Sequence, residues 1–542
     1  MRSLLAAVVL ALTVAVTSAG GQQPLAPAYG EAVFVVSGRG WGHGVGMSQY
    51  GAYGQAVAGR TYDQILAHYY SGTAIERAGR KEVRVLLAEG RRAVSVSSTT
   101  PFVARDATGA VFDLPKGALT IDAKLRLPAA AGSGLAKAVS PVVVRPAKKG
   151  LLALDGHTYR GKLELALQGA FLRVVNIVPL ESYLLGVVPG EVPYAWPAEA
   201  LKAQAVAARS YALANLVKGK PFDLYADVRS QVYGGVASEK PSTSRAVLDT
   251  AGEVVTYNGK VATTFYFSTS GGRTASAADV FGQSVPYLVS RPDPWDKASP
   301  HHRWGPVVLG ARTVQSKLGA GARVIDATSV TTPSGRLRAL VLQTTAGPQS
   351  IPASVVRTAL GLRSTWISVG VLRLDRASAG VVTFGSTARL SGLARGLGAP
   401  RLASSADGSA WADAGAVTVD ATGLVAVDVA PARTTRYRLE VAGSASSALL
   451  VQVAPRLTLA RPSVGDPFTL RGTVRPRLRG IAVTLERRRG TSWAPVGEAT
   501  TDAAGAFSVP LDDVVPVGAY RARTAASAGY AAGISPVLQV PG

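Results

Sequence analysis

The stretch from Val178 to Gly219 reads VPLESYLLGVVPGEVPYAWPAEALKAQAVAARSYALANLVKG, and it decides the fold around which the rest of this 542-residue chain is arranged. It begins with an apolar run that contains one carboxylate, Glu181, and it turns at Pro189-Gly190 just before Glu191. The second half predicts a long Ala-rich helix, because Pro197 suits a first helical turn and small apolar residues then recur at helical spacing.

The environment predicted for Glu191 makes this residue a candidate for catalysis. It is expected on a stiff turn ahead of a buried helix, among apolar neighbours that include Val188, Val192 and Trp196. A carboxyl group in such company has a raised pKa, which a general acid needs at neutral pH. The alternative is a carboxylate that caps the turn following it.

The composition excludes some classes of site. The chain has 58 Lys and Arg against 34 Asp and Glu, a net charge of +24, and no cysteine. Disulfides and thiolate metal sites are therefore absent from the chemistry available to it. The positive charge favours anionic surfaces such as wall polymers. Nucleic acid is another possible partner for such a charge. However, the sequence contains no nucleic-acid-binding motif, so we expect no nucleic acid to bind.

The first residues are typical of a secretory signal peptide. Arg2 precedes an apolar run from Leu4 to Val16, and small residues follow up to Ala19. The alternative is a permanent anchor, although the run is short for a bilayer span of about 20 residues. We expect residues 1–19 to be a signal peptide and the chain to be exported, extracellular or associated with the cell wall.

A glycine-rich loop follows a predicted strand at 31–37. It contains five glycines between Gly38 and Gly46, with His43 among them, so its backbone is free to approach another surface closely. Ser48 is expected to cap a short helix, and Thr61 with Gln64 forms a capping box for the next one.

The rest of the first 370 residues is expected to be β-rich with few helices. Residues 82–176 contain a series of short β-type runs, 242–250 are expected to be helical, and Asn258-Gly259 predicts a hairpin between 253–257 and 261–268. From about Gly370 two similar all-β blocks follow, at 371–455 and 456–542. We interpret each as an immunoglobulin-like sandwich.

Several of these motifs together resemble the SpoIID/LytB family of bacterial sporulation and cell-wall proteins. They are the opening stretch, SQVYGG at 230–235, STSGGRTAS at 268–276, GRLRALVL at 335–342, LGLRSTW at 360–366 and GRGWGHGVGMSQYGAYGQA at 38–56. The resemblance covers most of residues 33–368. In the family the GHGVGMSQ segment usually follows the Glu-bearing core, whereas here it comes first. This order indicates a circular permutation, and it predicts that residues 38–72 pack against the Glu191 region.

The resemblance implies an α+β fold, with a SpoIID-like catalytic domain at 30–370 built around a central helix and followed by the two β domains. It also implies a lytic transglycosylase that cleaves peptidoglycan glycan strands to 1,6-anhydromuramoyl products, with Glu191 as its single acid/base. Some relatives bind zinc before the Gln-x-Tyr-Gly-Gly motif. Here Arg229-Ser230 stand at that place and no cysteine exists, so we expect neither a metal nor another cofactor.

Other residues are candidates for substrate binding, each with an ordinary structural alternative. Arg209 could be a glycan contact or a helix-face residue, and the polar loop residues could bind sugar hydroxyls or only form turns. The candidate set is His43, Gln49, Arg209, Ser210, Tyr211, Ser230, Gln231, Tyr233, Ser270, Gly271 and Gly272.

Two further functions remain open at this stage. The chain could be a wall-binding modifier of an amidase, as the LytB side of the family implies, with a cleft but no turnover. It could also be a nonspecific polyanion binder. The expected partners are peptidoglycan glycan strands, with anionic wall polymers and a wall amidase as further candidates.

Overall fold

The structure, a computed structural model, describes residues 29–79, 82–129, 134–147, 150–375, 380–527 and 529–541. The predicted signal peptide at 1–19 lies outside the described residues. The chain divides into two units, one of residues 34–369 and one that contains 370–542 together with the segment up to Val33. Within the described residues, no helix is long and apolar enough to cross a membrane.

The larger unit contains all the helices that the structure describes. They are α1 (Gln49–Val57), α2 (Tyr62–Tyr69), α3 (Leu180–Glu191), α4 (Ala198–Ala214), α5 (Pro241–Asp249), α6 (Ala277–Phe281), α7 (Ala311–Leu318) and α8 (Ala353–Leu360). The capping predictions are confirmed: the Ser48 hydroxyl accepts the Gly51 N–H at the start of α1, and Thr61 with Gln64 forms the capping box of α2.

Residues 82–179 form the predicted β-rich region. Its main sheet has the strand order β16 (Leu224–Tyr225), β4 (Glu82–Arg91), β15 (Phe171–Pro179), β14 (Lys162–Gln168), β11 (Val142–Pro146), β6 (Phe102–Arg105) and β7 (Val111–Leu114). A second sheet has the order β13 (His157–Tyr159), β12 (Leu152–Leu154), β5 (Ala93–Ser98) and β8 (Gly117–Asp122), and β10 (Leu135–Lys137) pairs with β9 (Arg126–Pro128). Both sheets contribute to one apolar core. Strand β15 belongs to this packed region, and the chain passes directly from it into α3.

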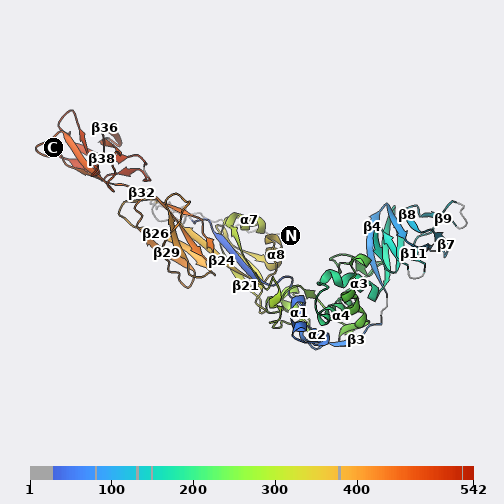
Figure 1. Ribbon diagram of the computed structural model, residues 1–542. Helices are drawn as coiled ribbons and strands as arrows, with labels where there is room; N and C mark the ends of the chain where they lie inside the picture. The colour runs from blue at the N-terminus through green and yellow to red at the C-terminus, as the bar shows by residue number, and fades with distance from the viewer. Residues whose placement is uncertain are drawn as a thin grey trace, which may run out of the picture. The chain divides into compact units, whose positions relative to one another are not determined.

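The helices α3, α4 and α5 share a second core with strands β4 and β16. Every third or fourth residue of α4 is a small apolar residue, and eleven of its seventeen residues are buried, because neighbouring elements pack on more than one of its faces. Helices α1 and α2, in blue in Figure 1, lie against α4.

The glycine loop packs as predicted. Val45 and Met47 share a core with α2 and with Ala203, Val206 and Ala207 of α4. Strand β2 (Met47–Ser48) pairs in parallel with β19 (Tyr266–Phe267). Gly46 has φ +79°, and a Cβ there would overlap the carbonyl oxygen of Phe265, so this close approach requires glycine. The prediction that 38–72 lie against the Glu191 region is confirmed, while the circular permutation itself stays a prediction.

The hairpin forms with a shorter second strand than predicted. Strand β17 (Glu253–Tyr257) pairs with β3 (Ala74–Arg77) and with β18, which is only Lys260–Val261. Asn258 and Gly259 both have positive φ, as the predicted tight turn requires. The chain then leaves this sheet, and Tyr266 pairs with the glycine loop instead.

The remaining strands of this unit belong to two further sheets. They are β1 (Val33–Arg39), which pairs with β20 (Arg303–Gly310), and the sheet of β21 (Val324–Thr331), β22 (Leu337–Thr344) and β23 (Gly347–Pro352). Strand β24 (Ile367–Asp375) carries the chain into the second unit.

The second unit is all-β within the described residues, and it contains two separate cores. The first is built from β24 with β26 (Ala388–Arg395) and β29 (Leu424–Val429), and from β25 (Val381–Thr383), β27 (Arg401–Ser405), β28 (Ala412–Ala416), β30 (Thr435–Val441), β31 (Ser444–Ala445) and β32 (Leu449–Ala454). The second is built from β33 (Arg456–Ala460), β34 (Thr469–Arg475) and β37 (Ala506–Pro510), and from β35 (Ala482–Arg489), β36 (Ser492–Thr500), β38 (Gly518–Thr524), β39 (Gly533–Ile534) and β40 (Leu538–Val540). The chain is therefore β-rich with few helices, and the immunoglobulin-like assignment of these two blocks stays a prediction.

Candidate functional site

Glu191 is the last residue of helix α3 rather than part of a turn. The turn predicted at Pro189-Gly190 is wrong, because the helix continues through both residues to Glu191. Burial of Val187 and Val188 holds this last turn in place, and tertiary packing of this kind overrides a weak local propensity. Proline removes only one backbone hydrogen bond near the helix end.

The carboxyl group of Glu191 sits where ionisation is unfavourable. Burial raises the pKa of Glu191, and a hydrogen bond from the Tyr266 side chain opposes part of that rise. The negative end of the α3 dipole also lies at this residue, which disfavours a negative charge there. No described cationic side chain contributes to the pKa of Glu191. The group therefore has the environment of a proton donor at neutral pH.

A chain of hydrogen bonds orients Tyr266 toward Glu191. The Gln231 Nε2 donates to the Tyr266 hydroxyl oxygen at 2.9 Å and also to the Ala208 carbonyl at 3.3 Å. The Tyr183 hydroxyl in turn donates to the Gln231 Oε1 at 3.2 Å. Because the Tyr266 oxygen accepts from Gln231, its own proton is free to be donated to Glu191. Burial and the charge of Glu191 raise the pKa of Tyr266 well above its usual value, so it keeps that proton.

Sequence reasoning missed Tyr266. It lies in the run VATTFYFS, where aromatic and β-branched residues alternate as in any strand, and nothing local distinguishes it from Phe265 or Phe267. Its position follows from the parallel pairing of β19 with the glycine loop, a contact between segments more than 200 residues apart.

The structure places Gln49 and Tyr211 near Glu191, and their role in substrate binding stays a prediction. The Gln49 Nε2 donates to the main-chain carbonyl of Glu191 at 3.2 Å and approaches the Gln204 Oε1 at 3.4 Å. Gln49 is 8% exposed, so it ties α1 to the end of α3 rather than offering a free amide. Tyr211 is partly exposed, its ring lies beside Tyr266, and burial followed by the charge of Glu191 raises the pKa of Tyr211.

Three aromatic rings from α1 and the α3–α4 connection gather on this side of the unit. Trp196 lies 5.0 Å from Tyr50 and 5.2 Å from Tyr53 between ring centroids. All three are partly exposed, and Tyr50 directly follows Gln49, which contacts Glu191. Partly exposed aromatic rings with polar edges are suited to pack against the apolar faces of a ligand. We call Tyr50, Tyr53 and Trp196 the aromatic cluster.

His43 hydrogen-bonds to the main chain of Tyr266, so its ring is not available to a ligand beside Glu191. Its Nδ1 accepts the Val45 N–H at 3.1 Å, so its Nε2 carries the proton and donates to the Tyr266 carbonyl at 3.1 Å. Burial is the main cause that lowers the pKa of His43 to about 4, which keeps the ring neutral. Phe265, Phe267 and Phe281 surround it.

Arg209 and Ser210 are structural, which corrects their place among the predicted substrate contacts. Arg209 is 0% exposed, and its guanidinium donates from Nε to Glu181 at 3.0 Å and from Nη1 and Nη2 to the carbonyls of Glu253 and Val247. The Ser210 hydroxyl donates to Val206 and accepts the Val255 N–H. With these groups fully used, neither side chain is available to a glycan.

Of the three substrate-binding candidates in the SQVYGG segment, one belongs to the Glu191 network and two do not. Gln231 belongs to the Glu191 network but is 2% exposed, so it acts through Tyr266. The Ser230 hydroxyl accepts the Tyr225 N–H, and the Tyr233 hydroxyl donates to Asn176 in the core. Ser230 and Tyr233 therefore shape the loop and are not brought to the carboxyl of Glu191.

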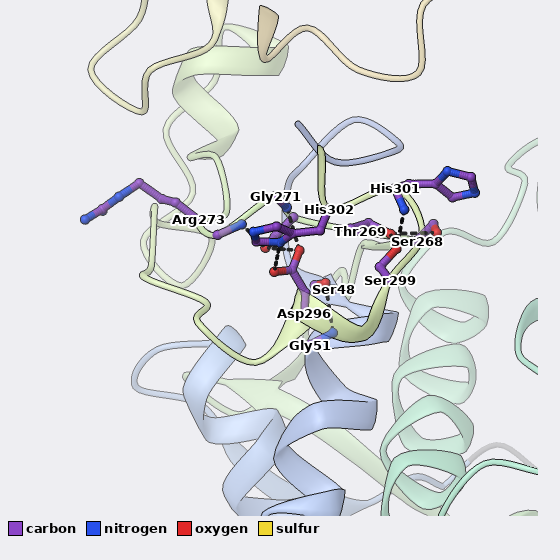
Figure 2. A network of polar contacts seen from close by, with 12 residues as sticks. Ser48, Gly51, Ser268, Thr269, Gly271, Arg273, Asp296, Ser299, His301 and His302 are labelled. Atoms are coloured by element: carbon purple, nitrogen blue, oxygen red, sulfur yellow. Dashed lines mark hydrogen bonds and ion pairs between the residues drawn. The ribbon is translucent and has the colours of Figure 1, made fainter. Parts of the chain in front are cut away.

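Ser270, Gly271 and Gly272 form part of a separate buried network, shown in Figure 2. The Asp296 Oδ2 accepts the Ser270 hydroxyl at 2.9 Å and the Gly271 N–H at 2.6 Å, and its Oδ1 contacts the His302 Nδ1 at 2.8 Å. The Gly272 N–H donates to the Ser270 hydroxyl. These contacts hold the STSGG turn against the segment that contains Asp296 and His302. They correct the prediction that Ser270 offers its hydroxyl to a sugar, because the side chain is fully buried.

A second buried carboxyl, Asp293, lies next to this network. The hydroxyls of Ser48, Tyr69 and Ser270 face it, yet neither of its oxygens has a hydrogen bond of normal geometry within the described residues. Burial, and then the negative charge of Asp296, raise the pKa of Asp293 to about 6. A Cβ on Gly51 would overlap this carboxyl, so α1 packs directly onto it.

The segment that contains Glu191 is similar to known proteins. Residues 168–257, which contain Glu191, Gln231 and helices α4 and α5, match the family model SpoIID, described as stage II sporulation protein. An uncharacterized protein of Brachyspira hyodysenteriae is 43% identical over 138 residues, which are 25% of this chain and 38% of that protein. Stage II sporulation protein D of Bacillus subtilis is 28% identical over 254 residues, 43% of this chain and 71% of that protein.

A third relative carries a different name. The amidase enhancer of Bacillus subtilis is 43% identical over 114 residues, which are 21% of this chain and 15% of that protein. The chain thus spans 38% of the length of the first of these relatives and 15% of the amidase enhancer. Residues 168–257 form a domain of the SpoIID family, and the chain is a relative of stage II sporulation protein D and of the amidase enhancer.

Proposed function

We propose that the chain is a peptidoglycan lytic transglycosylase that uses Glu191 as its single acid and base. The observation that carries this proposal is the carboxyl group of Glu191, which has a raised pKa, no cationic partner among the described residues, and a hydrogen bond from Tyr266 at the end of α3. Its surroundings also support glycan binding, because the partly exposed aromatic cluster is joined to it through Gln49.

The reaction needs only one such group. Glu191 protonates the glycosidic oxygen as the bond from that oxygen to C1 of the muramoyl residue breaks. The resulting carboxylate then takes the proton of the 6-hydroxyl of the same sugar, whose oxygen bonds to C1. The product carries a 1,6-anhydro ring, no water is consumed, and Glu191 regains its proton. A hydrolase would need a second carboxylate to activate water.

Tyr266 is the positioning residue in this scheme. Its hydroxyl hydrogen bond favours the ionised form of Glu191, the form that must accept the proton in the second step. The opposing effect of burial favours the protonated form required in the first step. The two effects together keep the group able to give and regain a proton within one turnover.

The relatives support a role of this kind at the bacterial cell wall. Their names refer to sporulation and to an amidase, and the net charge of +24 suits anionic wall polymers. Export through the signal peptide predicted at 1–19 would bring the chain to that substrate.

The test is a product analysis. Purified chain is incubated with peptide-free glycan strands, and the new ends are identified by mass spectrometry. We expect 1,6-anhydromuramoyl ends from the wild type. Glu191→Gln should react about 10²-fold to 10³-fold more slowly, because it lacks the proton donor and general acid catalysis contributes roughly this factor.

Glu199→Gln is the matched control. That carboxylate lies in the first turn of α4, where it accepts the Tyr62 N–H and pairs with Lys202, so its loss leaves the Glu191 network intact. If the products instead carry reducing muramic acid ends, which are heavier by one water molecule, the reaction is hydrolysis and the proposed mechanism is wrong. Absence of any new ends would leave the chain without turnover.

A second candidate function is favoured by the likeness to the amidase enhancer. The chain would then bind glycan strands at the aromatic cluster and stimulate a wall amidase without cleaving the strand itself. In that case Glu191→Gln would retain both strand binding and amidase stimulation, whereas Trp196→Leu would lose strand binding.

A further inference from the structure

A cavity lies behind the glycine loop, outside the Glu191 network. It has a volume of about 380 Å³ and is lined by residues from the loop, α6, β22, α8 and the segments beside them. Its walls include His43, Asp279, Phe281, Arg336, Leu337 and Arg357. The volume is within the range of sites that hold a small organic ligand.

Arg336, from the GRLRALVL motif, is the notable side chain of this cavity. It is 1% exposed, and its Nη2 donates to the carbonyls of Ser270 and Arg273, each at 3.3 Å. Its Nε and Nη1 have no hydrogen-bond partner among the described residues. Buried N–H groups of a guanidinium are costly to leave unmatched, so two such nitrogens beside a cavity point to a missing acceptor.

The glycine loop fixes this guanidinium in place. Gly44 has φ +91°, and a Cβ there would overlap the guanidinium of Arg336. On another side the Cζ of Arg336 lies 5.5 Å from the ring centroid of Trp366. The guanidinium therefore packs between the glycine loop and Trp366.

The charges around the cavity are unbalanced. Arg357 is half-buried and Arg338 is exposed, and both line the cavity with Arg336. Asp279 is the acidic residue among the lining residues, and its Oδ2 accepts the Ser334 N–H at 3.1 Å. Within the described residues it forms no ion pair with these arginines. Three guanidinium groups therefore face one carboxylate.

We infer that this cavity binds one oxyanion group, a carboxylate or a phosphate, carried on a small organic body. The oxyanion contacts the free nitrogens of Arg336 and the guanidinium of Arg357, and the body packs on Phe281, Leu337 and Pro352. The two sources in a cell wall are the lactyl carboxylate of a muramoyl sugar and the phosphate of a phosphate-bearing polymer. Binding here is independent of turnover at Glu191.

The test is calorimetric titration of the full chain with four probes. N-acetylmuramic acid supplies the carboxylate, glycerol 3-phosphate supplies the phosphate, and N-acetylglucosamine and glycerol are their neutral counterparts. We expect at least one anion to bind more tightly than its neutral counterpart, and more weakly as salt is added. Carboxylate binding alone identifies the muramoyl source, and phosphate binding alone identifies the polymer.

Variants assign the binding to the cavity. Arg357→Gln should weaken anion binding about tenfold, the loss of one charge-assisted hydrogen bond. Asp279→Asn should strengthen it, because it removes the opposing charge while its oxygen still accepts the Ser334 N–H. Arg105→Gln, at an exposed arginine of strand β6, and Glu191→Gln should leave it unchanged.

Three outcomes would overturn the inference. In the first, neither anion binds. In the second, the neutral counterparts bind as tightly as the anions. In the third, Arg357→Gln binds the anion as tightly as the wild type does. Anion binding that is lost in Trp196→Leu but kept in Arg357→Gln would belong to the aromatic cluster. Since Glu191→Gln keeps the cavity, failure of the proposed transglycosylase and failure of this site are separately observable.

Discussion

Helix α3 carries a glutamate at each end, and the two have different surroundings. Glu181, in the first turn, is met by the buried guanidinium of Arg209 and by the Gly252 N–H. Glu191, the last residue, is met by one phenol hydroxyl and by no described cation. The helix dipole adds to this contrast, because its positive end is near Glu181 and its negative end is near Glu191. A single helix thus separates a structural carboxylate from a candidate proton donor, and the side chains that distinguish the two, Arg209 and Tyr266, lie on α4 and β19.

The largest expected effect comes from removing the cation beside Glu181. Arg209→Met should lower the free energy of unfolding of the 34–369 unit by about 3–5 kcal/mol, because a partly buried carboxylate loses its partner. Urea unfolding with hydrogen exchange on α3 and α4 measures this.

The double variant Glu181→Leu with Arg209→Met is the control for that experiment. It removes both charges, and it should recover much of the stability that the single variant loses. If the two variants are equally unstable, the ion pair is not the reason that Arg209 is needed.

Asp293 extends the comparison to a third carboxyl group, whose pKa, like that of Glu191, is affected by no cation among the described residues. Its pKa is about 6 in the folded chain against an ordinary 3.8. As pH rises from about 4 to about 6, the unfolded state loses its proton first, so the free energy of unfolding falls by about 3 kcal/mol and then levels off. Asp293→Asn should lack this fall, which thermal unfolding across that pH range measures. Parallel curves for wild type and variant would contradict it.

Giving Glu191 a cation would make it resemble Glu181. Tyr211→Lys places an ammonium group where a tyrosine already responds to the charge of Glu191. A nearby positive charge lowers the pKa of Glu191, so less of it is protonated at neutral pH. We expect strand cleavage at pH 7 about a hundredfold slower than in Tyr211→Met, with recovery as pH falls. Identical pH profiles for the two variants would show that residue 211 is too far away.

A smaller change tests the side chain that hydrogen-bonds to the Glu191 carboxyl group. Tyr266→Phe removes the hydrogen bond that lowers the pKa of Glu191, so that pKa rises further. Activity that requires protonated Glu191 should then persist to higher pH, while its maximum falls about tenfold for the loss of one hydrogen bond to a charged group. The pH dependence of kcat measures both. A lower maximum with an unmoved alkaline limb would give Tyr266 only a structural role.

The smallest effect is expected at the aromatic cluster. Trp196→Leu should raise KM for soluble glycan strands about fivefold with little change in kcat, because ring stacking is worth about 1 kcal/mol. Trp493→Leu, in strand β36, is the matched tryptophan control. An equal change in both variants would argue against a sugar contact at Trp196.

The predictable parts of this molecule are those that local patterns determine. Ser48 and the Thr61–Gln64 pair marked the starts of α1 and α2, and the spacing of small residues predicted α4. Pro189-Gly190 misled because a proline and a glycine favour a turn locally, while packing of Val187 and Val188 keeps the chain helical.

The candidate site was predictable only where its chemistry is local. Glu191 could be singled out from its apolar neighbours in sequence. Tyr266 could not, because its role depends on pairing with a loop more than 200 residues away. Arg209 was left open between two roles, since the partner that decides them, Glu181, lies 28 residues earlier and on another helix.

The position of the glycine loop has a consequence for how the protein is made. Residues 43–49 leave the ribosome early, but the Glu191 carbonyl that Gln49 contacts is 142 residues later, and the Tyr266 carbonyl that His43 contacts is 223 residues later. Contacts that span so much chain close late, because the loop entropy must be overcome first. A nascent chain that ends before Tyr266 therefore lacks both the phenol that orients Glu191 and the strand that anchors the loop. Any cleaving activity is therefore withheld until the chain has been made at least as far as Tyr266.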